Sequence, residues 1–323
     1  MRYAVTGAAG FIGSHLAETL VGAGHAVVGF DCFTDYYDLA VKEENARGLD
    51  IRRVDLAEAP LDFSGLDGIF HLAGQPGVLS FGDVFPLYLR RNLLASQRVF
   101  EAAARDGVRV VFASSSSVYG AAERYPTPED TPPRPLSPYG ITKLGCEHLA
   151  AAYVREFGLD CVVVRYFNAF GPRQRPDMAF TRIAFALADG GTFELYGDGE
   201  QSRGWTYVSD VVDGTIAAME RGNGTYNVGG ALEASMNETI ALFERISGRS
   251  LDVRRTPAVP GDQRRTSADT TRIRSELGWS PRVSLEEGVH EQWKWASGRT
   301  PVRERAESPA AFRRPWPRPQ SRQ

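Results

Sequence analysis

The sequence predicts an α/β fold in which a doubly wound parallel sheet is joined to a smaller mixed α/β domain. Two observations carry this prediction. In the first half of the chain, short runs rich in Val, Ile and Phe alternate with longer amphipathic stretches, which is the strand–helix order of a parallel sheet. After about residue 170 the pattern loosens into helices separated by short strands and Gly-rich turns.

The strands expected in the first half are mostly continuous apolar runs, as is typical of parallel strands buried on both faces. They lie at residues 3–6, 26–30, 51–54, 68–72, 109–113 and 161–165. Helical periodicity separates them at residues 13–21, 83–105 and 139–157. We expect this sheet-forming domain to span residues 1–170, with a later segment around 205–230 returning to it.

The second half is expected to form a smaller domain over residues 171–298. Its helices are predicted at residues 178–188, 208–220, 236–247 and 285–296, and its strands at 193–196, 225–228 and 251–254. Residues 299–323 contain seven Arg, five Pro and two Glu and show no period, so we expect a disordered tail of net charge about +5.

The composition excludes several classes of protein. The chain of 323 residues is 42% hydrophobic and 24% charged, which is incompatible with a wholly disordered or collagen-like protein. A net charge of −3 gives no basic surplus for nucleic acid, and no apolar run is long enough for a membrane span. The first residues do not have a signal-peptide pattern, and three Cys cannot form a disulfide framework, so we expect a cytoplasmic protein.

The clearest motif is a Gly-rich turn between the first strand and the first helix. Gly7 suits a tight turn, Gly10 lets the backbone approach a pyrophosphate, and Gly13 allows close helix–strand packing. The next strand ends at Asp31, at the distance expected for a carboxylate that binds a ribose. Because this carboxylate repels a 2′-phosphate, the pattern predicts a Rossmann domain that binds NAD rather than NADP.

Two further strand ends are expected to reach the same cofactor, since ligands bind at the carboxyl ends of parallel strands. Asp55 and Leu56 follow the third strand, where an adenine would lie. Leu72 and Ala73 follow the fourth, beside His71, which we interpret as a packing residue rather than a catalytic one.

The fifth strand ends in a run of four serines, and Tyr139 and Lys143 follow in a predicted helix. At i and i+4 the two side chains share one face of that helix. A nearby ammonium group favours the phenolate form of a tyrosine, which can then act as a base. A serine at the strand end can bond the same substrate oxygen.

With these motifs the chain resembles the extended short-chain dehydrogenase/reductase superfamily, and within it the NAD-dependent sugar-nucleotide epimerases and dehydratases, closest to UDP-glucuronate 4-epimerases. The resemblance covers about residues 1–298 and leaves the tail out. It rests on TGAAGFIGSHL, DYYD, HLAGQPGV, SSSSVYG, SPYGITK, RYFNAFGPRQRPDMAF, YGDGEQSRGWTYVSDVV, YNVGG and GDQRRTSADTTRIRSELGW.

The resemblance implies a role for each matching residue. Tyr139 would be the catalytic base, Lys143 would bind the nicotinamide ribose, and Ser115 would bond the reacting hydroxyl. Further contacts to NAD would come from Phe11, Ile12, Gln75, Asn92 and Tyr166. Contacts to a UDP-sugar would come from Gly77, Ser115, Ser116, Ser117, Asn168, Arg175, Thr192, Phe193, Arg203, Asp262 and Arg265. No metal is expected, and relatives suggest a homodimer that pairs the long helices near 83–105 and 139–157.

The reaction expected from the resemblance is C4 epimerisation through a 4-keto sugar. Dehydratases and uronate decarboxylases carry carboxylates at the positions of Ser116 or Ser117, whereas a 4-epimerase needs none there. Arg175, in a stretch similar to that of UDP-glucuronate 4-epimerases, would pair with a sugar carboxylate, although Asn168 stands where several of those enzymes have Thr. UDP-glucose 4-epimerase, UDP-glucuronate decarboxylase, 4,6-dehydratase and a non-catalytic NAD-binding protein stay open as alternatives.

Overall fold

The computed structural model describes residues 1–77, 84–230, 232–258 and 263–299. The predicted tail therefore lies outside the described residues from position 300 onward, and so does Asp262. Within the described part, no helix is long and apolar enough to cross a membrane.

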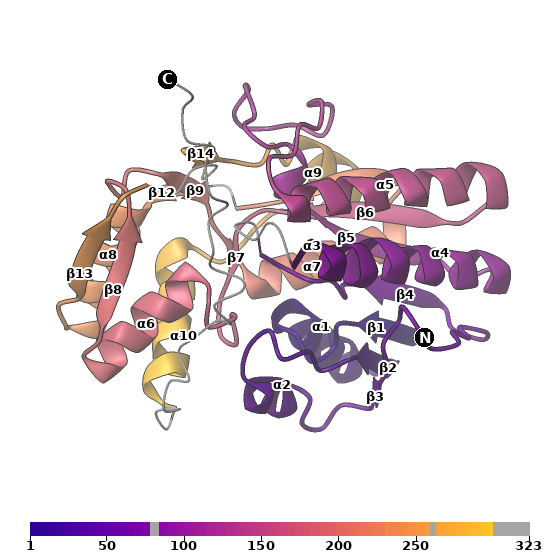
Figure 1. The fold of residues 1–323 in the computed structure, drawn as a ribbon, viewed down its shortest axis with the longest axis horizontal. Coiled ribbons are helices and arrows are strands. Elements are labelled where there is room, and N and C mark those ends of the chain that lie inside the picture. The colour runs from indigo at the N-terminus through magenta and orange to yellow at the C-terminus, as the bar shows by residue number, and fades with distance from the viewer. Residues whose placement is uncertain (78–83, 231, 259–262, 300–323) are drawn as a thin grey trace, which may run out of the picture.

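The larger part of the molecule is built on a seven-stranded sheet, as the sequence predicts (Figure 1). All its neighbouring strands run parallel, in the order β11-β6-β5-β4-β1-β2-β3. Order in the chain reverses at β1, which lies between β4 and β2 and so forms the switch point where such sheets bind ligands. The strands are β1 (Arg2–Thr6), β2 (Ala26–Asp31), β3 (Ile51–Arg53), β4 (Gly68–His71), β5 (Val110–Ser115), β6 (Cys161–Tyr166) and β11 (Gly224–Val228).

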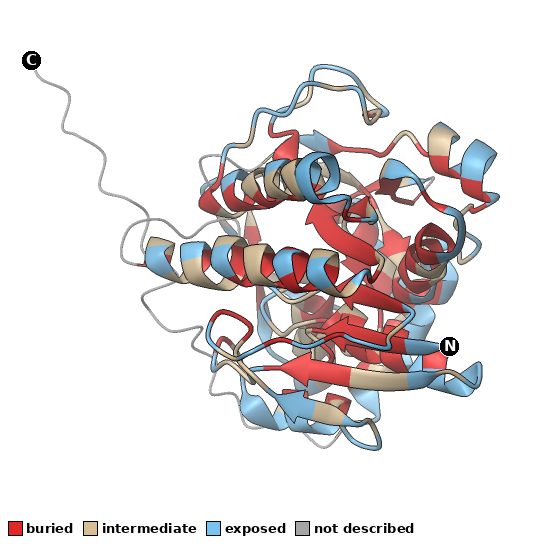
Figure 2. Ribbon diagram, turned by 90° about the vertical axis from the view of Figure 1, so that its right-hand side faces the viewer, coloured by how far each residue is buried: buried red, intermediate tan, exposed pale blue. Residues whose placement is uncertain are grey.

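Helices cover both faces of this sheet. On one face α1 (Phe11–Gly22) packs against α7 (Val208–Arg221), and on the other α4 (Ala95–Asp106) packs against α5 (Pro138–Phe157). Each layer has its own buried apolar cluster against the strands. The central strands are consequently buried along their length, which explains why they read as continuous apolar runs (Figure 2).

The long helix predicted at residues 83–105 is in fact three consecutive segments. They are α3 (Phe85–Tyr88), the π-helix η2 (Leu89–Leu94) and α4, while residue 83 lies outside the described part. The one wider turn of a π-helix keeps the apolar face nearly continuous, so periodicity alone does not reveal it. Such turns are frequent at functional sites, and Asn92 lies in this one.

The smaller part of the molecule lies beside the larger part (Figure 1). It has its own buried core. The helix α8 begins and ends where the sequence predicts, because Ser235 and Glu238 form a capping box at its first turn. The elements of this part are β7 (Ala169–Phe170), α6 (Ala179–Asp189), β8 (Thr192–Tyr196), β9 (Ser202–Gly204), β10 (Thr206–Tyr207), β12 (Glu233–Ser235), α8 (Met236–Ser247), β13 (Asp252–Thr256), β14 (Arg265–Thr266) and α10 (Leu285–Ser297).

The short strands β7, β9, β10, β12 and β14, of two or three residues each, were not predicted from the sequence. Three short helical elements also do not show in the sequence periodicity, because they span two turns or less. They are α2 (Leu39–Asn45), the 3-10 turn η3 (Ser116–Val118) and α9 (Thr271–Leu277).

Candidate active site

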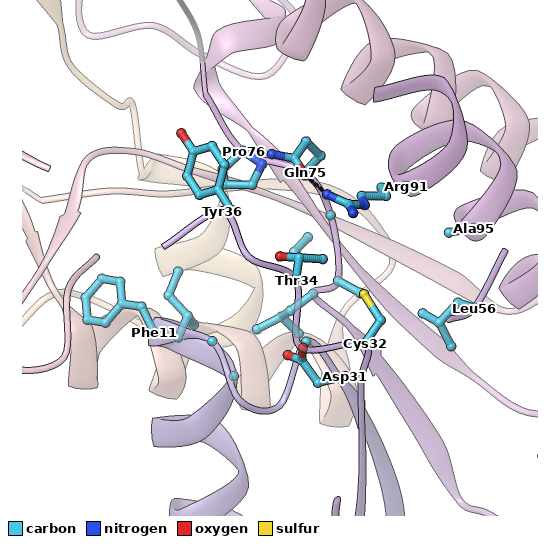
Figure 3. Close-up of a pocket in the computed structure, with 18 of the residues that line it drawn as sticks. Phe11, Asp31, Cys32, Thr34, Tyr36, Leu56, Gln75, Pro76, Arg91 and Ala95 are labelled. Atoms are coloured by element: carbon cyan, nitrogen blue, oxygen red, sulfur yellow. Dashed lines mark hydrogen bonds between the residues drawn. The ribbon is translucent and has the colours of Figure 1, made fainter. Parts of the chain in front are cut away.

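A cavity opens at the carboxyl ends of β1 to β6, where the switch point predicts a ligand (Figure 3). Of the residues that the sequence assigns to NAD, all except Asn92 line it. They come from six segments that are far apart in the chain, at the ends of β1, β2, β3, β4 and β6 and on the first turns of α5, and the sheet brings them together. Tyr36, Tyr37, Lys42 and Arg91 also line the cavity, and sequence reasoning did not find these four. The only signal for the two tyrosines is the DYYD motif.

The Gly-rich turn leaves no room for side chains. Gly7 has a φ of +72°, and a Cβ there would lie 3.0 Å from the Ala73 backbone. A Cβ on Gly13 would lie 2.1 Å from the Gly7 carbonyl oxygen. The helix α1 begins at Phe11 with no side chain capping its first N–H groups. This uncapped helix end, directed at the cavity, fits a cofactor diphosphate.

Asp31 lies at the end of β2 and is 8% exposed. Its carboxylate accepts N–H bonds from Ala9 at 3.2 Å and from Phe33 at 2.8 Å, and the Lys42 ammonium lies 3.6 Å away. These contacts hold the carboxylate at the cavity wall and leave acceptor capacity for ribose hydroxyls. A fixed negative charge at this point fits NAD rather than a 2′-phosphorylated cofactor.

Gln75 supplies an unsatisfied polar atom at the cavity wall. Its side chain is 1% exposed, and the Oε1 atom accepts a 2.7 Å bond from Arg91 (Figure 3). The Nε2 atom has no partner among the described residues. Since buried amide groups are nearly always bonded, this donor is suited to a ligand acceptor. Asn92 holds the Gln75 backbone in place through Oδ1, at 2.6 Å from the Gln75 nitrogen.

Tyr139 and Lys143 meet in the cavity on the first turns of α5. Ser137 caps this helix by accepting a bond from the Gly140 N–H, which fixes where the pair begins. The Lys143 ammonium is buried and donates to the Ala113 carbonyl of β5 at 2.7 Å. It lies 6.0 Å from the centre of the Tyr139 ring. The pair is therefore anchored to the central sheet, with the phenol half-buried at the cavity wall.

The serines after β5 divide between two environments. Ser114 lines the cavity and donates to Glu147, whereas Ser115 is 9% exposed and accepts a bond from the Ser117 N–H at 3.1 Å. Ser116 lines a smaller hollow that it shares with Arg265. Ser115 itself lines neither hollow and stands between these two serines in the chain.

A buried polar network supports this strand end from behind. Arg165 of β6 and Glu147 of α5 form an ion pair at 2.6 Å, and Arg165 also donates to the Tyr119 hydroxyl at 2.8 Å. Tyr119 in turn donates to Asn227 of β11 at 2.7 Å. Burial raises the pKa of Tyr119 to about 12, so the hydroxyl is a neutral link in the network. Periodicity does not point to this network, because only the fold brings these four residues together.

Arg175 enters the cavity from the smaller part of the molecule. Its Nε and Nη2 atoms each lie 3.0 Å from one oxygen of Asp177, and the guanidinium lies 5.8 Å from the centre of the Tyr36 ring. Burial alone would raise the pKa of Asp177, but the Arg175 charge and bonds outweigh it and hold that pKa below its usual value. Asp177 therefore stays ionised and fixes one edge of the guanidinium.

Other residues assigned to the sugar nucleotide lie outside this cavity. The Phe193 ring is packed in the core of the smaller part, so any contact it made with substrate would come from its backbone. Thr192 bonds Asp252, Asn168 donates to Thr266, and Arg265 forms a two-bond pair with Glu233. Gly77 accepts a bond from Tyr88, and Arg203 donates to the Ser202 carbonyl on β9.

His71 has the packing role that we preferred for it. The ring is fully buried and is bonded on both nitrogens, to Thr6 at 2.7 Å and to Ser96 at 3.0 Å. Burial, with a smaller effect of Lys143, lowers the pKa of His71 to about 3. The described residues contain no group of three or more His, Cys, Asp or Glu side chains that could hold a metal.

Comparisons with known proteins agree with this geometry. The chain is 39% identical over 306 residues to the uncharacterized UDP-glucose epimerase YtcB of Bacillus subtilis, covering 90% of this chain and 96% of that one. The solved structure of UDP-glucuronic acid 4-epimerase from Bacillus cereus, in complex with UDP-glucuronic acid and NAD, is 36% identical with a TM-score of 0.88, covering 92% and 99%.

A third similar protein is MoeE5, whose structure with UDP-glucuronic acid and NAD is 39% identical, with a TM-score of 0.83 and coverages of 91% and 98%. MoeE5 has also been solved with UDP-glucose and NAD. Residues 3–229 of this chain match the NAD dependent epimerase/dehydratase family. The chain is therefore an enzyme that belongs to the NAD-dependent epimerase/dehydratase family, with NAD as its cofactor.

Proposed function

We propose that the protein interconverts UDP-glucuronate and UDP-galacturonate by epimerisation at C4. The observation that carries this proposal is the position of Arg175, whose guanidinium faces the cavity that also holds Tyr139 and Lys143. A cation at this place, fixed by its own counter-ion, is suited to a substrate with a carboxylate on the sugar.

The proton chemistry belongs to Tyr139. Lys143 places a buried ammonium group 6.0 Å from the centre of the Tyr139 ring, and we assign to the Tyr139 oxygen the removal of the C4 hydroxyl proton as a general base. When bound in this cavity, NAD would supply the acceptor for the C4 hydride and, once reduced, its donor. Between these events the 4-keto sugar turns about its diphosphate link, and Tyr139 gives the proton back to the oxygen of the opposite epimer.

The acids that line the cavity favour epimerisation over dehydration. Among the described lining residues the carboxylates are Asp31 and Asp55, both at the strand ends assigned to adenosine. Ser116 and Ser117 follow the strand that faces Tyr139, and a serine cannot act as the general acid that removal of water from the sugar requires. An exchange of configuration at C4 needs only the tyrosine and the cofactor.

The geometry of Arg175 supports a uronate as the substrate. A guanidinium can bind carboxylates along two edges, and Asp177 occupies the edge formed by Nε and Nη2. Within the part of the chain that the structure describes, Nη1 of Arg175 has no bonded partner, so the edge formed by Nη1 and Nη2 can take a second carboxylate. Held there as an anion in the sugar plane, the C5 carboxylate of the 4-keto sugar is poorly oriented to leave as carbon dioxide.

The test is the incubation of the purified protein with UDP-glucuronate and, separately, with UDP-glucose, followed by separation of the products and mass measurement. We expect a new product of unchanged mass from UDP-glucuronate. A product lighter by carbon dioxide would identify a decarboxylase, and one lighter by water a dehydratase. Turnover of UDP-glucose alone would identify a neutral-sugar epimerase, and absence of any turnover a non-catalytic NAD-binding protein.

Replacing Arg175 with Ala tests the assignment of this side chain. Removal of a charge-assisted bidentate contact should raise KM for UDP-glucuronate by about tenfold or more, with a much smaller change for UDP-glucose. The matched control is Arg182→Ala, since Arg182 stacks on the Phe193 ring of the smaller part and does not line the cavity. An equal loss on both sugars in the Arg175 variant would refute the carboxylate contact.

A further inference from the structure

The loop that carries Arg175 is held from three directions by three consecutive side chains. Arg173 reaches back to α1 of the sheet-forming part, and Gln174 turns into the smaller part. Arg175 points into the cavity between them. The position of Arg175 relative to the cofactor site is therefore set by its two neighbours in the chain.

Arg173 adopts a backbone conformation that a residue with a side chain rarely adopts. Its φ is +66°, in the left-handed region, which is a strained choice for a residue other than Gly, Asn or Asp. Two bonds to Glu18 of α1 hold it there, Nη1 to Oε1 at 2.8 Å and Nη2 to Oε2 at 2.5 Å. The Arg173 side chain is 20% exposed and that of Glu18 is 45% exposed, so the pair lies at the surface and is only partly shielded from solvent.

His15 of α1 ties the same two segments together. Its Nε2 atom lies 2.9 Å from the Pro172 carbonyl oxygen, and its Nδ1 atom lies 3.1 Å from Nη2 of Arg173. A carbonyl can only accept and a guanidinium can only donate, so Nε2 carries the hydrogen and Nδ1 is an acceptor. Only the neutral ring satisfies both bonds. Burial, followed by the Arg173 charge, lowers the pKa of His15 to about 4, which keeps the ring neutral at physiological pH.

Gln174 fixes the other side of the loop. It is 2% exposed, donates through Nε2 to the Ala169 carbonyl at 2.9 Å, and accepts through Oε1 from the Thr181 N–H at 3.1 Å. Thr181 belongs to α6, and its hydroxyl also accepts a bond from Gln292 of α10. The loop is thus anchored to the core of the smaller part as well as to α1.

We propose that Glu18, His15 and Arg173 are positioning residues that hold Arg175 in register with the cofactor. This inference rests on the proposed function, because it takes Arg175 as the residue that binds the sugar carboxylate. The helix α1 presents its first turn to the cofactor cavity and carries His15 and Glu18 on its next turns. The helix that is placed to hold the cofactor diphosphate therefore also fixes the distance from that cofactor to the carboxylate-binding side chain.

The first test replaces Arg173 with Ala. Because Arg175 itself is intact, we expect KM for UDP-glucuronate to rise about tenfold, with kcat within about twofold of wild type and NAD affinity unchanged. Arg173→Lys keeps one charge contact but not the two-bond geometry, so its KM should be intermediate. A loss of NAD affinity as large as the loss of substrate affinity would contradict the proposal, as would an unchanged KM.

The second test asks whether Arg173 acts through Arg175. In a double-mutant cycle the Arg173→Ala/Arg175→Ala variant should have the same KM as Arg175→Ala alone. If the effects of the two substitutions on KM simply added, the proposal would be contradicted. His15→Gln retains one donor and one acceptor and should behave like wild type, whereas His15→Ala should resemble Arg173→Ala. If KM for UDP-glucuronate rose as much in His15→Gln as in His15→Ala, the hydrogen-bonded link through this ring would be refuted.

A third measurement separates this inference from the proposed function. Hydrogen exchange of the peptide that covers residues 171–178 needs no substrate, and we expect faster exchange in Arg173→Ala than in wild type. Arg245→Ala is the matched control, because it breaks an exposed pair with Glu286 elsewhere in the smaller part. Absence of UDP-glucuronate turnover by wild type would refute the function alone. Unchanged exchange in Arg173→Ala would refute the positioning role alone.

Discussion

Among single residues, the proposed catalytic pair is indicated by its spacing in the sequence, and the fold then fixes where its side chains lie. Tyr139 and Lys143 stand one helical turn apart, and that spacing is visible in the sequence. The Lys143 side chain is oriented by its bond to the carbonyl of Ala113, which lies on a strand 30 positions earlier in the chain. The pair therefore depends on the packing of α5 against β5.

Replacing Tyr139 with Phe removes the proposed base and leaves the cavity shape nearly unchanged. We expect NAD to stay bound and kcat to fall by about a hundredfold or more, because general acid–base catalysis contributes on this order. The measurement is steady-state turnover beside NAD binding. Tyr153→Phe, on the same helix but bonded to Gln97 away from the cavity, is the control and should keep its activity. Substantial turnover by the Tyr139 variant would argue against the assignment.

At the scale of elements, α5 is joined to the sheet by the buried pair of Glu147 and Arg165. Both side chains are less than a tenth exposed, with values of 9% and 8%. This pair and its neighbours hold the end of β5, where Ser114 donates to Glu147. The connection places the serines and Tyr139, which come from two different elements, at one edge of the sheet.

Replacing Glu147 with Leu leaves Arg165 buried without its counter-ion. We expect the free energy of unfolding, measured by urea denaturation, to fall by about 3–5 kcal/mol. Glu156→Leu, on the same helix, removes an exposed pair with Arg155 and should cost less than about 1 kcal/mol. Similar decreases of the free energy of unfolding in the two variants would show that the buried pair contributes no more to stability than the exposed pair.

For the whole molecule, the buried His71 and the half-buried His15 make stability depend on pH. Burial lowers the pKa of His71 to about 3 and that of His15 to about 4. Both groups have a pKa of about 6.5 in the unfolded chain. Below that pH the unfolded chain binds more protons than the folded one, so the free energy of unfolding decreases as pH falls through this window.

Urea denaturation at pH 7 and pH 5 measures this effect. We expect wild type to lose stability between these values, and His71→Gln to lose less, because a glutamine takes up no proton on unfolding. A glutamine side chain cannot fully replace the two bonds that the His71 ring makes to Thr6 and Ser96. The free energy of unfolding of the Gln variant at pH 7 should therefore also be lower than that of wild type. An identical decrease in both proteins would contradict the assignment of the effect to His71.

Local sequence patterns were enough to predict the parallel sheet and the loops expected to bind the cofactor. Each of these signals is local, because Gly7, Gly10 and Gly13 belong to one turn, and Tyr139 and Lys143 belong to one helix. The structure confirms the sheet. It also places these residues at one cavity, while their individual roles stay predictions.

Contacts between side chains that are distant in the sequence became visible only in the folded structure. The contact of Arg173 with Glu18 joins residues 155 positions apart, and Arg165 reaches Tyr119 and Glu147 from a third element. The hydrophobic periodicity also did not predict the π-helical turn at Asn92 or the burial of Phe193 in the core of the smaller part. A periodic pattern records which face of an element is apolar. The partners of a polar side chain depend on how the elements pack, and that information is not local.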